Sequence, residues 1–459
     1  MCGIAGYYCR DGNNAATQVM LTLYAQQHRG QESCGIAASN GQKLNSHNAM
    51  GYVKEAFSGS ELDNLAGVNA IGHARYPTRG TSALENTQPH VIETLSGPIY
   101  SIASNGDIVN YEEVADELRV KGVHFSSKND GELLGRYIVY MHEREGMEIV
   151  DAIKMLMKRV KGAYSAVFLT RDCLYAFRDF WGFRPMMFGR VGQDVAICSE
   201  SCAMDLLRAE NVREVQPGEI IVVTPKNEFS IEYAQQPLLP DQKWKTHHCI
   251  FELIYFARPD SWEFNEYVYD VRHKIGAQLA SYDGDIADVV VPVPDSANFI
   301  AMGYADAKGI PYNMGLIRNH YVGRTFIRPD QYTRDESVRQ KFNPLKGFFR
   351  GKRIVLVDDS IVRGTTIRKL VRMVKGAGAT EVHLRIGSPP VKNSCYYGID
   401  TPTRNELIAN NMTTEEIRDH FDADSLKYLR IEDLRKCVKE PDGFCYACFN
   451  GDYPLPKTI

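Results

Sequence analysis

The sequence predicts two domains of mixed helix and strand: a β-rich first half with intervening helices and a doubly wound α/β second half. The chain has 459 residues, enough for two separate hydrophobic cores. Runs rich in valine, isoleucine, tyrosine and phenylalanine, at residues 98–105, 162–179 and 194–201, predict strands in the first half. Residues 111–122 and 146–162 have helical periodicity and end in glycine, so they predict amphipathic helices between those strands.

A complete strand–loop–helix–strand unit over residues 351–390 defines the second half. Its first strand is continuously apolar, as in a parallel sheet covered on both faces. Its helix has one apolar stripe, formed by Ile367, Leu370, Val371 and Val374. Residues 285–297 and 299–310 predict an earlier strand and helix of the same sheet. The polar segment 224–244 contains proline and predicts the end of the first domain and the start of a linker.

Composition excludes several classes of function. The hydrophobic fraction of 44% and the charged fraction of 24% are ordinary for a globular protein, and a net charge of -4 argues against binding nucleic acid through bulk positive charge. No apolar run approaches the roughly 18 residues that span a bilayer, and the first residues lack a signal-peptide pattern. We therefore expect a cytoplasmic protein whose 11 cysteines are reduced, so that metal binding or catalysis is a better explanation for them than disulfides.

Two carboxylates and a phosphate-type turn occur in the sequence VLVDDSIVRGTT. Asp358 and Asp359 stand at the carboxyl end of a buried strand, where open α/β sheets place their ligands. Residues 363–366 then turn into a helix, whose first N–H groups and threonine hydroxyls suit a phosphate monoester. The simpler interpretation is a helix start with Asp and Thr caps, but capping needs only one such residue and this loop supplies five. The loop therefore predicts a sugar-phosphate site.

A cysteine follows the initiator methionine in the opening sequence MCGIAG. If Met1 is removed, Cys2 becomes an N-terminal nucleophile whose own α-amino group, with a reference pKa of about 7.7–8.0, can act as the general base. Gly3 and Gly6 would let the backbone pack closely around it. Taken alone, the segment is equally consistent with an incidental start of small residues.

The VLVDDSIVRGTT loop closely resembles the phosphoribosyl pyrophosphate loop of type I phosphoribosyltransferases. The resemblance implies magnesium contacts at Ser296, Asp358 and Asp359. It also implies that phosphoribosyl pyrophosphate is bound by Asp358, Asp359, Ser360, Arg363, Gly364, Thr365 and Thr366, and by Asp295 and Ser296 in the loop after the earlier strand. By itself that earlier loop would be an ordinary strand-to-helix turn.

The long polar stretch between the two loops is basic, with Arg318, Arg324, Arg328, Arg334, Arg339 and Lys341. Such stretches are usually solvated surface or lids. Opposite a pyrophosphate leaving group, a basic lid would neutralise developing charge and exclude water, and we expect Arg324 and Lys341 to contact the substrate.

Four motifs in the first half resemble class II glutamine amidotransferases in order and spacing: YAQQHRGQESCGI, GHARYPTRG, SNGDIVNYEEV and SKNDGELL. The resemblance implies an N-terminal-nucleophile fold with αββα layers and Cys2 as nucleophile and amine base. It implies that Arg75 and Asp130 bind the charged end of glutamine, and that the Asn105 side chain and the Gly106 N–H form the oxyanion hole. The sequence departs from the usual pattern at Cys34, Arg79 and Asp107.

The two halves together resemble the amidotransferases that join a glutaminase to a phosphoribosyltransferase, and the stretches HCIFELIYFARPDS and GLIRNHYVGRTFI are specific to them. This implies a glutaminase domain over 2–235 and a phosphoribosyltransferase domain with a C-terminal cluster-binding tail over 236–459. Ammonia released at Cys2 would cross to the second site and displace pyrophosphate, giving phosphoribosylamine in the first committed step of purine synthesis. The sequence departs from the family pattern at DSWEFN, where a glycine is usual near Asn265.

The resemblance also implies partners: glutamine, phosphoribosyl pyrophosphate, purine nucleotide inhibitors and further copies of the chain in a dimer or tetramer, but no nucleic acid and no membrane. Two alternatives differ in class. One is a glutaminase joined to a sugar isomerase or an ATP-using synthase, against which the VDDSIVRGTT loop argues. The other is a regulator that binds the substrate without turnover, which would need neither Cys2 nor a basic lid.

Four cysteines remain to be explained by metal chemistry. Cys445 and Cys448 form a C-x-x-C pair, and Cys249 and Cys395 are distant single residues. Zinc, the usual alternative, generally uses two local pairs. The iron–sulfur branch of the amidotransferases has one pair and two singles, so the resemblance implies a 4Fe–4S cluster. We expect the remaining Cys9, Cys34, Cys173, Cys198, Cys202 and Cys437 to be packed or surface residues.

Overall fold

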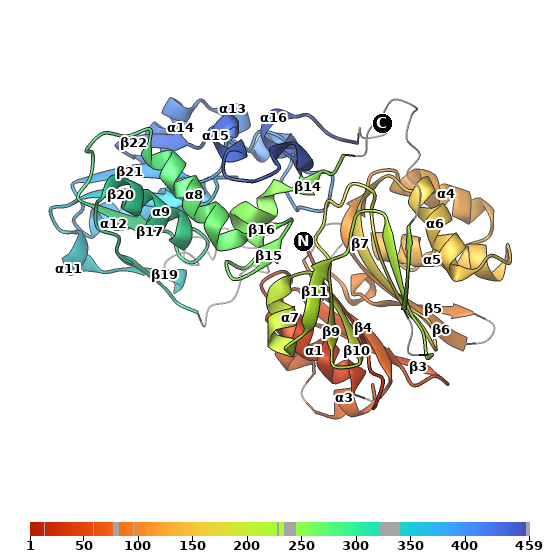
Figure 1. The fold of residues 1–459 in the computed structure, drawn as a ribbon. Helices are drawn as coiled ribbons and strands as arrows, with labels where there is room; N and C mark the ends of the chain where they lie inside the picture. Colours follow the sequence, from red (N-terminus) through yellow and green to blue (C-terminus); the bar gives the residue numbers. More distant parts are fainter. Residues whose placement is uncertain are drawn as a thin grey trace.

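The computed structural model describes residues 1–12, 14–57, 59–76, 82–94, 97–226, 229–233, 245–320 and 340–455. Two β-sheets stack face to face in the first domain, and helices cover both outer faces (Figure 1). The first sheet has the strand order β11 (Glu210–Glu214), β9 (Met187–Val191), β10 (Asp194–Cys198), β1 (Gly3–Tyr8), β4 (Asn69–Arg75), β2 (Ser33–Ser39), β3 (Leu44–Met50). The second has the order β13 (Phe229–Tyr233), β12 (Glu219–Val223), β8 (Leu174–Arg178), β7 (Gly162–Leu169), β6 (Gly97–Ile108), β5 (His90–Thr94).

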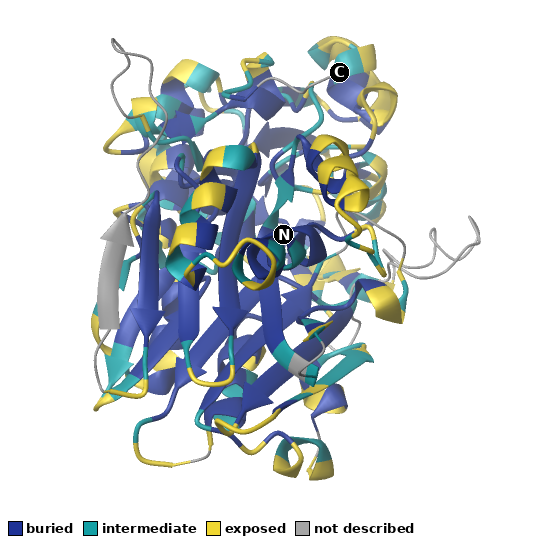
Figure 2. Ribbon diagram, turned by 90° about the vertical axis from the view of Figure 1, so that its right-hand side faces the viewer, coloured by how far each residue is buried: buried dark blue, intermediate teal, exposed yellow. Residues whose placement is uncertain are grey.

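Three hydrophobic layers hold these sheets together. Aliphatic side chains from both inner faces, such as Ile4, Ile71 and Val167, fill the space between the sheets. The first sheet is covered outside by α1 (Ala15–Ala25) and α7 (Ser201–Leu207), and the second by α4 (Tyr111–Val120), α5 (Asp130–Glu143) and α6 (Ile149–Arg159). Figure 2 shows the strands buried and the solvent-facing sides of the helices exposed. The αββα prediction is therefore confirmed.

The second domain is built on four parallel strands in the order β17 (Val289–Pro292), β20 (Arg353–Asp358), β21 (Glu381–Ile386), β22 (Ser425–Tyr428). One face packs on α8 (Val268–Ala280) and α9 (Asn298–Lys308), the other on α12 (Thr365–Gly376) and α14 (Thr414–Phe421). The apolar stripe predicted on α12 is buried. A doubly wound sheet is therefore confirmed, and its carboxyl edge gathers the loops after β17 and β20.

Short elements complete the chain. The helical ones are α2 (Val53–Ala56), α3 (Ser60–Asp63), α11 (Lys346–Phe349), α13 (Ile408–Asn411), α15 (Ile431–Arg435), α16 (Ala447–Asn450), the 3₁₀ turns Leu84–Asn86, Arg404–Glu406 and Pro441–Gly443, and a π-helix over Glu252–Phe256. The strand pairs are β18 (Leu316–Arg318) with β19 (Phe342–Pro344), β15 (Trp262–Glu263) with β16 (Glu266–Tyr267), and β14 (His248–Cys249) with β23 (Phe444–Cys445). No helix among the described residues is long and apolar enough to cross a membrane.

The two domains share a buried junction. Met1 is fully buried in the hydrophobic core of the second domain, beside Phe251 and Ile254. Figure 1 shows the N-terminus between the two domains. The proposed boundary between residues 235 and 236 falls within 234–244, outside the described residues, and it stays a prediction.

Candidate active sites and cysteine cluster

Cys2 lies immediately before β1, at the edge where the first domain meets the second. Its Sγ lies 3.4 Å from both the backbone N and the backbone O of Tyr76. Its backbone N donates a hydrogen bond of 3.0 Å to Oδ1 of Asn105. The register of β1 on β4 pairs Gly3 with Ala74, which brings the start of β1 beside Arg75 and Tyr76. Cys2 is only 6% exposed, so a reaction there would be shielded from bulk water.

Asn105 and Gly106 lie together on β6, and Asn105 faces Cys2. While Oδ1 of Asn105 accepts from Cys2, its Nδ2 is buried and has no hydrogen-bond partner among the described residues. A buried amide donor without an acceptor is costly, and it is the type of group that stabilises an oxyanion. Gly106 is closely packed: a Cβ there would lie 1.8 Å from the carbonyl oxygen of Ala163 on β7. The structure thus brings Asn105 next to the predicted nucleophile, and Gly106 is the next residue on the same strand.

The two residues predicted to bind glutamine are buried at the ends of their elements. Arg75 ends β4 and forms a 2.5 Å ion pair with Glu32, a partner that the sequence analysis missed. Asp130 begins α5, and its Oδ2 accepts a hydrogen bond of 3.3 Å from the N–H of Ile108. Among the three sequence departures, Cys34 is buried on β2, Asp107 lies on β6 and Arg79 is outside the described residues.

A cavity of about 370 Å³ lies at the carboxyl edge of the second domain's sheet. Nine of the residues predicted to bind phosphoribosyl pyrophosphate line it: Asp358, Asp359, Ser360, Arg363, Gly364, Thr365, Thr366, Ser296 and Lys341. Asp295 is not among the lining residues and forms a 2.6 Å ion pair with Arg318, and Arg324 is outside the described residues. Tyr76, which touches the Cys2 thiol, lines the same cavity.

The two carboxylates of this cavity are arranged to bind positive charge. Asp359 accepts hydrogen bonds of 2.6 Å from the hydroxyls of Ser296 and Ser360, and Asp358 accepts one of 2.9 Å from the N–H of Asp359. Burial raises the pKa of Asp358 well above its usual range, and the neighbouring charge of Asp359 raises it further. Burial also raises the pKa of Asp359. A bound cation or a ligand with several hydroxyl groups would offset the free-energy cost of burying two negative charges here.

Cys249, Cys395, Cys445 and Cys448 line one small enclosed cavity between the junction segment and the C-terminal tail. The parallel pairing of β14 with β23 places Cys249 directly opposite Cys445. Burial raises the pKa of Cys249 to about 11, which favours the neutral form of its thiol. The cavity wall includes Phe183, Ile250 and Tyr397.

No other cysteine lines this cavity. Cys437 is buried elsewhere, with its thiol donating to the carbonyl oxygen of Asp433 at 3.3 Å, and none of the 11 cysteines forms a disulfide. Within the described ranges, no three His, Cys, Asp or Glu side chains are arranged to hold a single metal ion. The structure therefore brings the four cysteines of the sequence prediction to one cavity.

The sequence analysis missed Arg29, a fully buried residue just after α1. Its Nε donates a 3.1 Å hydrogen bond to the carbonyl oxygen of Cys2. It also missed the carboxylates that surround Arg29 from both domains, Glu200 and Glu252. Arg29 and Glu252 lie within the motifs YAQQHRGQESCGI and HCIFELIYFARPDS, but nothing in the charge pattern of those motifs distinguishes a buried charge from a surface charge.

A glutaminase-type fold with its thiol, followed by a phosphoribosyltransferase fold with its loop, defines a glutamine-dependent amidotransferase. A glutamine amidotransferase domain model matches residues 80–205, and a phosphoribosyl transferase domain model matches residues 268–386. The chain is 45% identical over 457 residues to the amidophosphoribosyltransferase of Methanothermobacter thermautotrophicus, covering 99% of this chain and 94% of that one. The chain belongs to the amidophosphoribosyltransferase family.

Other relatives agree. The chloroplastic amidophosphoribosyltransferase 2 of Arabidopsis thaliana is 46% identical, with all of this chain and 80% of that one covered. The solved glutamine phosphoribosylpyrophosphate amidotransferase of B. subtilis, complexed with ADP and GMP, has a TM-score of 0.89 and 40% identity over 99% of this chain and 97% of that one. A solved structure described as the allosteric regulatory enzyme of purine biosynthesis has a TM-score of 0.91 at 40% identity, with the same coverage. This chain is accordingly a glutamine-dependent phosphoribosyl amidotransferase of purine biosynthesis.

Proposed function

We propose that glutamine, water and phosphoribosyl pyrophosphate are converted to phosphoribosylamine, glutamate and pyrophosphate, with the work divided between Cys2 and the Asp358–Asp359 loop. The observation that carries this division is the position of Tyr76, which touches the Cys2 thiol and lines the cavity of the phosphoribosyl loop. The two sites therefore lie on either side of one residue, as a transfer of ammonia between them requires.

At the first site, removal of Met1 would make the nitrogen of Cys2 a free amine beside Oδ1 of Asn105. Burial, assisted by the charges of Arg184 and Arg29, lowers the pKa of the Met1 amine to about 5. A terminal amine at Cys2 would lie 3.0 Å from Oδ1 of Asn105, and its neutral form would take the thiol proton. The thiolate attacks the glutamine amide carbon and forms a thioester. The proton on the amine leaves with ammonia, and water then releases glutamate.

The oxyanion of the tetrahedral intermediate would accept hydrogen bonds from Nδ2 of Asn105 and from the Gly106 N–H. The support for this role is the lack of another partner for that Nδ2 atom among the described residues. Arg75 and Asp130 would bind the carboxylate and the ammonium group of glutamine, in keeping with their opposite charges and their burial beside the site.

At the second site, the N-terminal turn of α12 would bind the 5-phosphate, and Asp358 and Asp359 would bind the ribose hydroxyls. Gly364 has a φ of +75° where the loop enters α12, and a Cβ there would lie 2.6 Å from the ring of Phe421. Magnesium held through Asp358, Asp359 and Ser296 would neutralise pyrophosphate charge as the C1–oxygen bond breaks. Lys341 and the predicted lid residue Arg324 would contact the leaving group. Ammonia attacks C1, and pyrophosphate leaves with the bonding electron pair.

We further propose that Cys249, Cys395, Cys445 and Cys448 bind a structural 4Fe–4S cluster that joins the junction segment to the C-terminal tail. Support comes from their shared cavity and from the pairing of β14 with β23, which places Cys249 opposite Cys445. When bound, the cluster would deprotonate the four thiols and cross-link the two segments. Because the B. subtilis enzyme was solved with ADP and GMP, purine nucleotides are proposed inhibitors here, acting on a dimer or tetramer.

The decisive experiment compares two nitrogen sources, with glutamate and pyrophosphate followed together in the presence of magnesium. The Cys2→Ala variant should lose synthesis from glutamine and keep synthesis from ammonium salt at alkaline pH. The double variant Asp358→Asn, Asp359→Asn should lose about a hundredfold or more with both sources, because the ribose and its metal are no longer held. Loss of ammonia-dependent synthesis in folded Cys2→Ala protein would refute the division of labour.

A further inference from the structure

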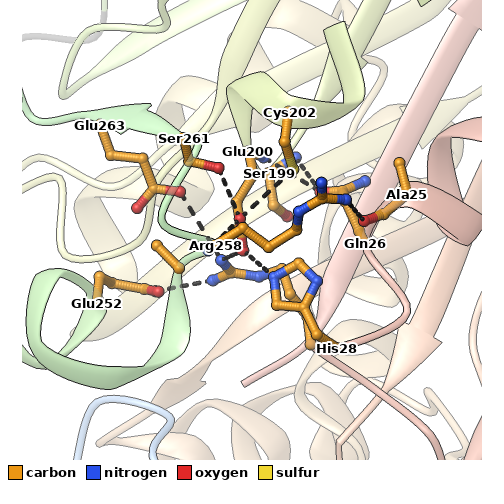
Figure 3. Close-up of polar contacts among 12 residues, drawn as sticks. Ala25, Gln26, His28, Ser199, Glu200, Cys202, Glu252, Arg258, Ser261 and Glu263 are labelled. Carbon is orange, nitrogen blue, oxygen red and sulfur yellow. Dashed lines mark hydrogen bonds and ion pairs between the residues drawn. The ribbon is translucent and has the colours of Figure 1, made fainter. Parts of the chain in front are cut away.

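The domain junction contains a fully buried group of charges centred on Arg29. Figure 3 shows polar contacts in this region, with Glu200, Glu252 and Glu263 labelled. The Arg29 guanidinium contacts Glu200 of the first domain through Nη1. It contacts Glu252 of the second domain through Nη2, at 2.8 Å. Glu200 itself bridges the domains, because its Oε2 accepts from the Arg258 N–H at 3.0 Å and from the Ser261 hydroxyl at 2.9 Å.

The same guanidinium makes a third contact, with the backbone of the nucleophilic residue. Nε of Arg29 donates to the carbonyl oxygen of Cys2 at 3.1 Å. One planar group therefore fixes the backbone of Cys2 relative to carboxylates from two domains. A lysine could not make these contacts together, since it lacks the rigid fork of donors. Buried ion pairs are weak contributors to stability, so a positioning role is the better explanation for their presence here.

Glu252 is the first residue of the π-helix Glu252–Phe256, which also borders the phosphoribosyl cavity. Tyr255 and Phe256 line that cavity, and the Phe256 ring meets the Tyr76 ring edge-on at 6.2 Å. Arg184, which lines the cysteine cavity, lies 3.5 Å from the Glu252 carboxylate. Glu252 thus belongs to an element that touches the second site while its side chain reaches toward the first.

We propose that Glu252, a residue of the phosphoribosyltransferase domain, is a positioning residue for the Cys2 nucleophile and acts through Arg29. This inference rests on the proposed role of Cys2. It means that the glutaminase site is incomplete without the second domain, and that the element bordering the phosphoribosyl cavity also sets the geometry of the thiol.

The test is Glu252→Gln, which keeps the size and one acceptor of the side chain but removes its charge. We expect kcat for glutamine hydrolysis to fall about tenfold or more while KM for glutamine stays within about twofold, since the change affects the thiol rather than glutamine binding. Alkylation of Cys2 by iodoacetamide should slow in parallel. Synthesis from ammonium salt should be unchanged, which shows that the second domain is folded.

Glu263→Gln is the matched control. Glu263 lies in the same buried group, 3.9 Å from Arg29, but neither of its oxygens has a hydrogen-bond partner among the described residues. Burial and the charges of Glu200 and Glu252 raise the pKa of Glu263 well above its usual range, so glutamine is a close substitute for its neutral form. This variant should behave as wild type in all three measurements.

Arg29→Lys provides a second route to the same answer if Glu252→Gln does not fold, and it should show the same loss of kcat. The proposal is overturned if Glu252→Gln hydrolyses glutamine at the wild-type rate, or if synthesis from ammonium salt falls equally. If Cys2→Ala protein still hydrolyses glutamine, the proposed function itself fails, so the two failures can be told apart.

Discussion

At the residue scale, Cys2 shows how far sequence reasoning reaches. The first two residues of the sequence are enough to predict the chemistry of an N-terminal thiol and its amine. The accompanying motifs predict that Asn105 and Gly106 belong to the same site. The hydrogen bond from Cys2 to Asn105 spans 103 positions along the chain, and only the fold can provide it. The same limit hid Arg29 and Glu252, because a charged residue in a sequence does not reveal whether the tertiary structure buries it.

Asn105→Asp separates the two functions of the Asn105 side chain. The aspartate keeps an oxygen to accept from the Cys2 nitrogen but loses the Nδ2 donor. We expect kcat for glutamine hydrolysis to fall about a hundredfold or more, the usual cost of one oxyanion donor, with ammonia-dependent synthesis retained. Steady-state kinetics with both nitrogen sources measure this. A variant with near-normal glutaminase activity would show that Asn105 is not an oxyanion donor.

Met1 should be absent from the active enzyme. Its backbone carbonyl would otherwise convert the nitrogen of Cys2 into an amide, which cannot accept the thiol proton. Intact-mass measurement of active protein should show a chain beginning at Cys2, and inactive fractions should be enriched in the longer form. Active protein in which most molecules retain Met1 would contradict the mechanism.

At the element scale, period and composition predicted the regular structure well. The strands β6, β7, β8, β10, β17, β20 and β21 and the helices α4, α6, α9 and α12 lie where their patterns place them. Two-residue strands such as β14 and β23 could not be predicted, because they are too short for any periodicity and their partner lies far along the chain. The four cysteines were found by spacing and resemblance, while their convergence required this pairing.

The cysteine assignment predicts different outcomes for chemically identical substitutions. Cys445→Ala and Cys448→Ala should lose most of the iron and sulfide from anaerobically purified protein, and should unfold at lower temperature because the tail is no longer tied to the junction. Cys437→Ala should keep full iron content, since Cys437 does not line the cavity. About four irons per chain are expected in wild type. Stoichiometric zinc without sulfide would decide for the alternative metal.

At the scale of the whole molecule, two domains predicted from length and pattern share one buried junction that the sequence did not reveal. A glutaminase-type motif and a junction motif meet there, through Arg29 of YAQQHRGQESCGI and Glu252 of HCIFELIYFARPDS. The family resemblance identified these stretches of sequence. It could not show that they contact each other across the domain junction, because that contact depends on the tertiary structure.

Global stability should fall in mild acid. His73 and His90 are buried between elements of the first domain, and burial lowers the pKa of His73 to about 3 and that of His90 to about 4. In the unfolded chain both titrate near pH 6.5, so between pH 6.5 and 4 the unfolded state binds more protons and folding weakens as pH falls. Each histidine should lower the free energy of unfolding by up to about 1.4 kcal/mol for each pH unit of acidification across that window.

Denaturant unfolding at pH 7, 6 and 5 measures this effect. The contribution of these two histidines should be nearly constant above pH 7, and His90→Gln should reduce the loss between pH 6 and 5. If that variant has the same pH dependence as wild type, His90 is not the group responsible.

The parallel pairing of β14 with β23 has a consequence for biosynthesis. While the chain emerges from the ribosome, the glutaminase domain can fold early, since its strands are contiguous in the nascent polypeptide. The segment at His248 and Cys249 must then wait for almost the whole second domain to be translated before Phe444 and Cys445 arrive to pair with it. Assembly of the proposed cluster would therefore come late, after Phe444 and Cys445 have been translated. A stop codon shortly before Phe444 would remove the strand that pairs with Cys249, so it would damage the junction between the two domains rather than a peripheral segment. The Cys249 thiol would then be exposed to oxidation.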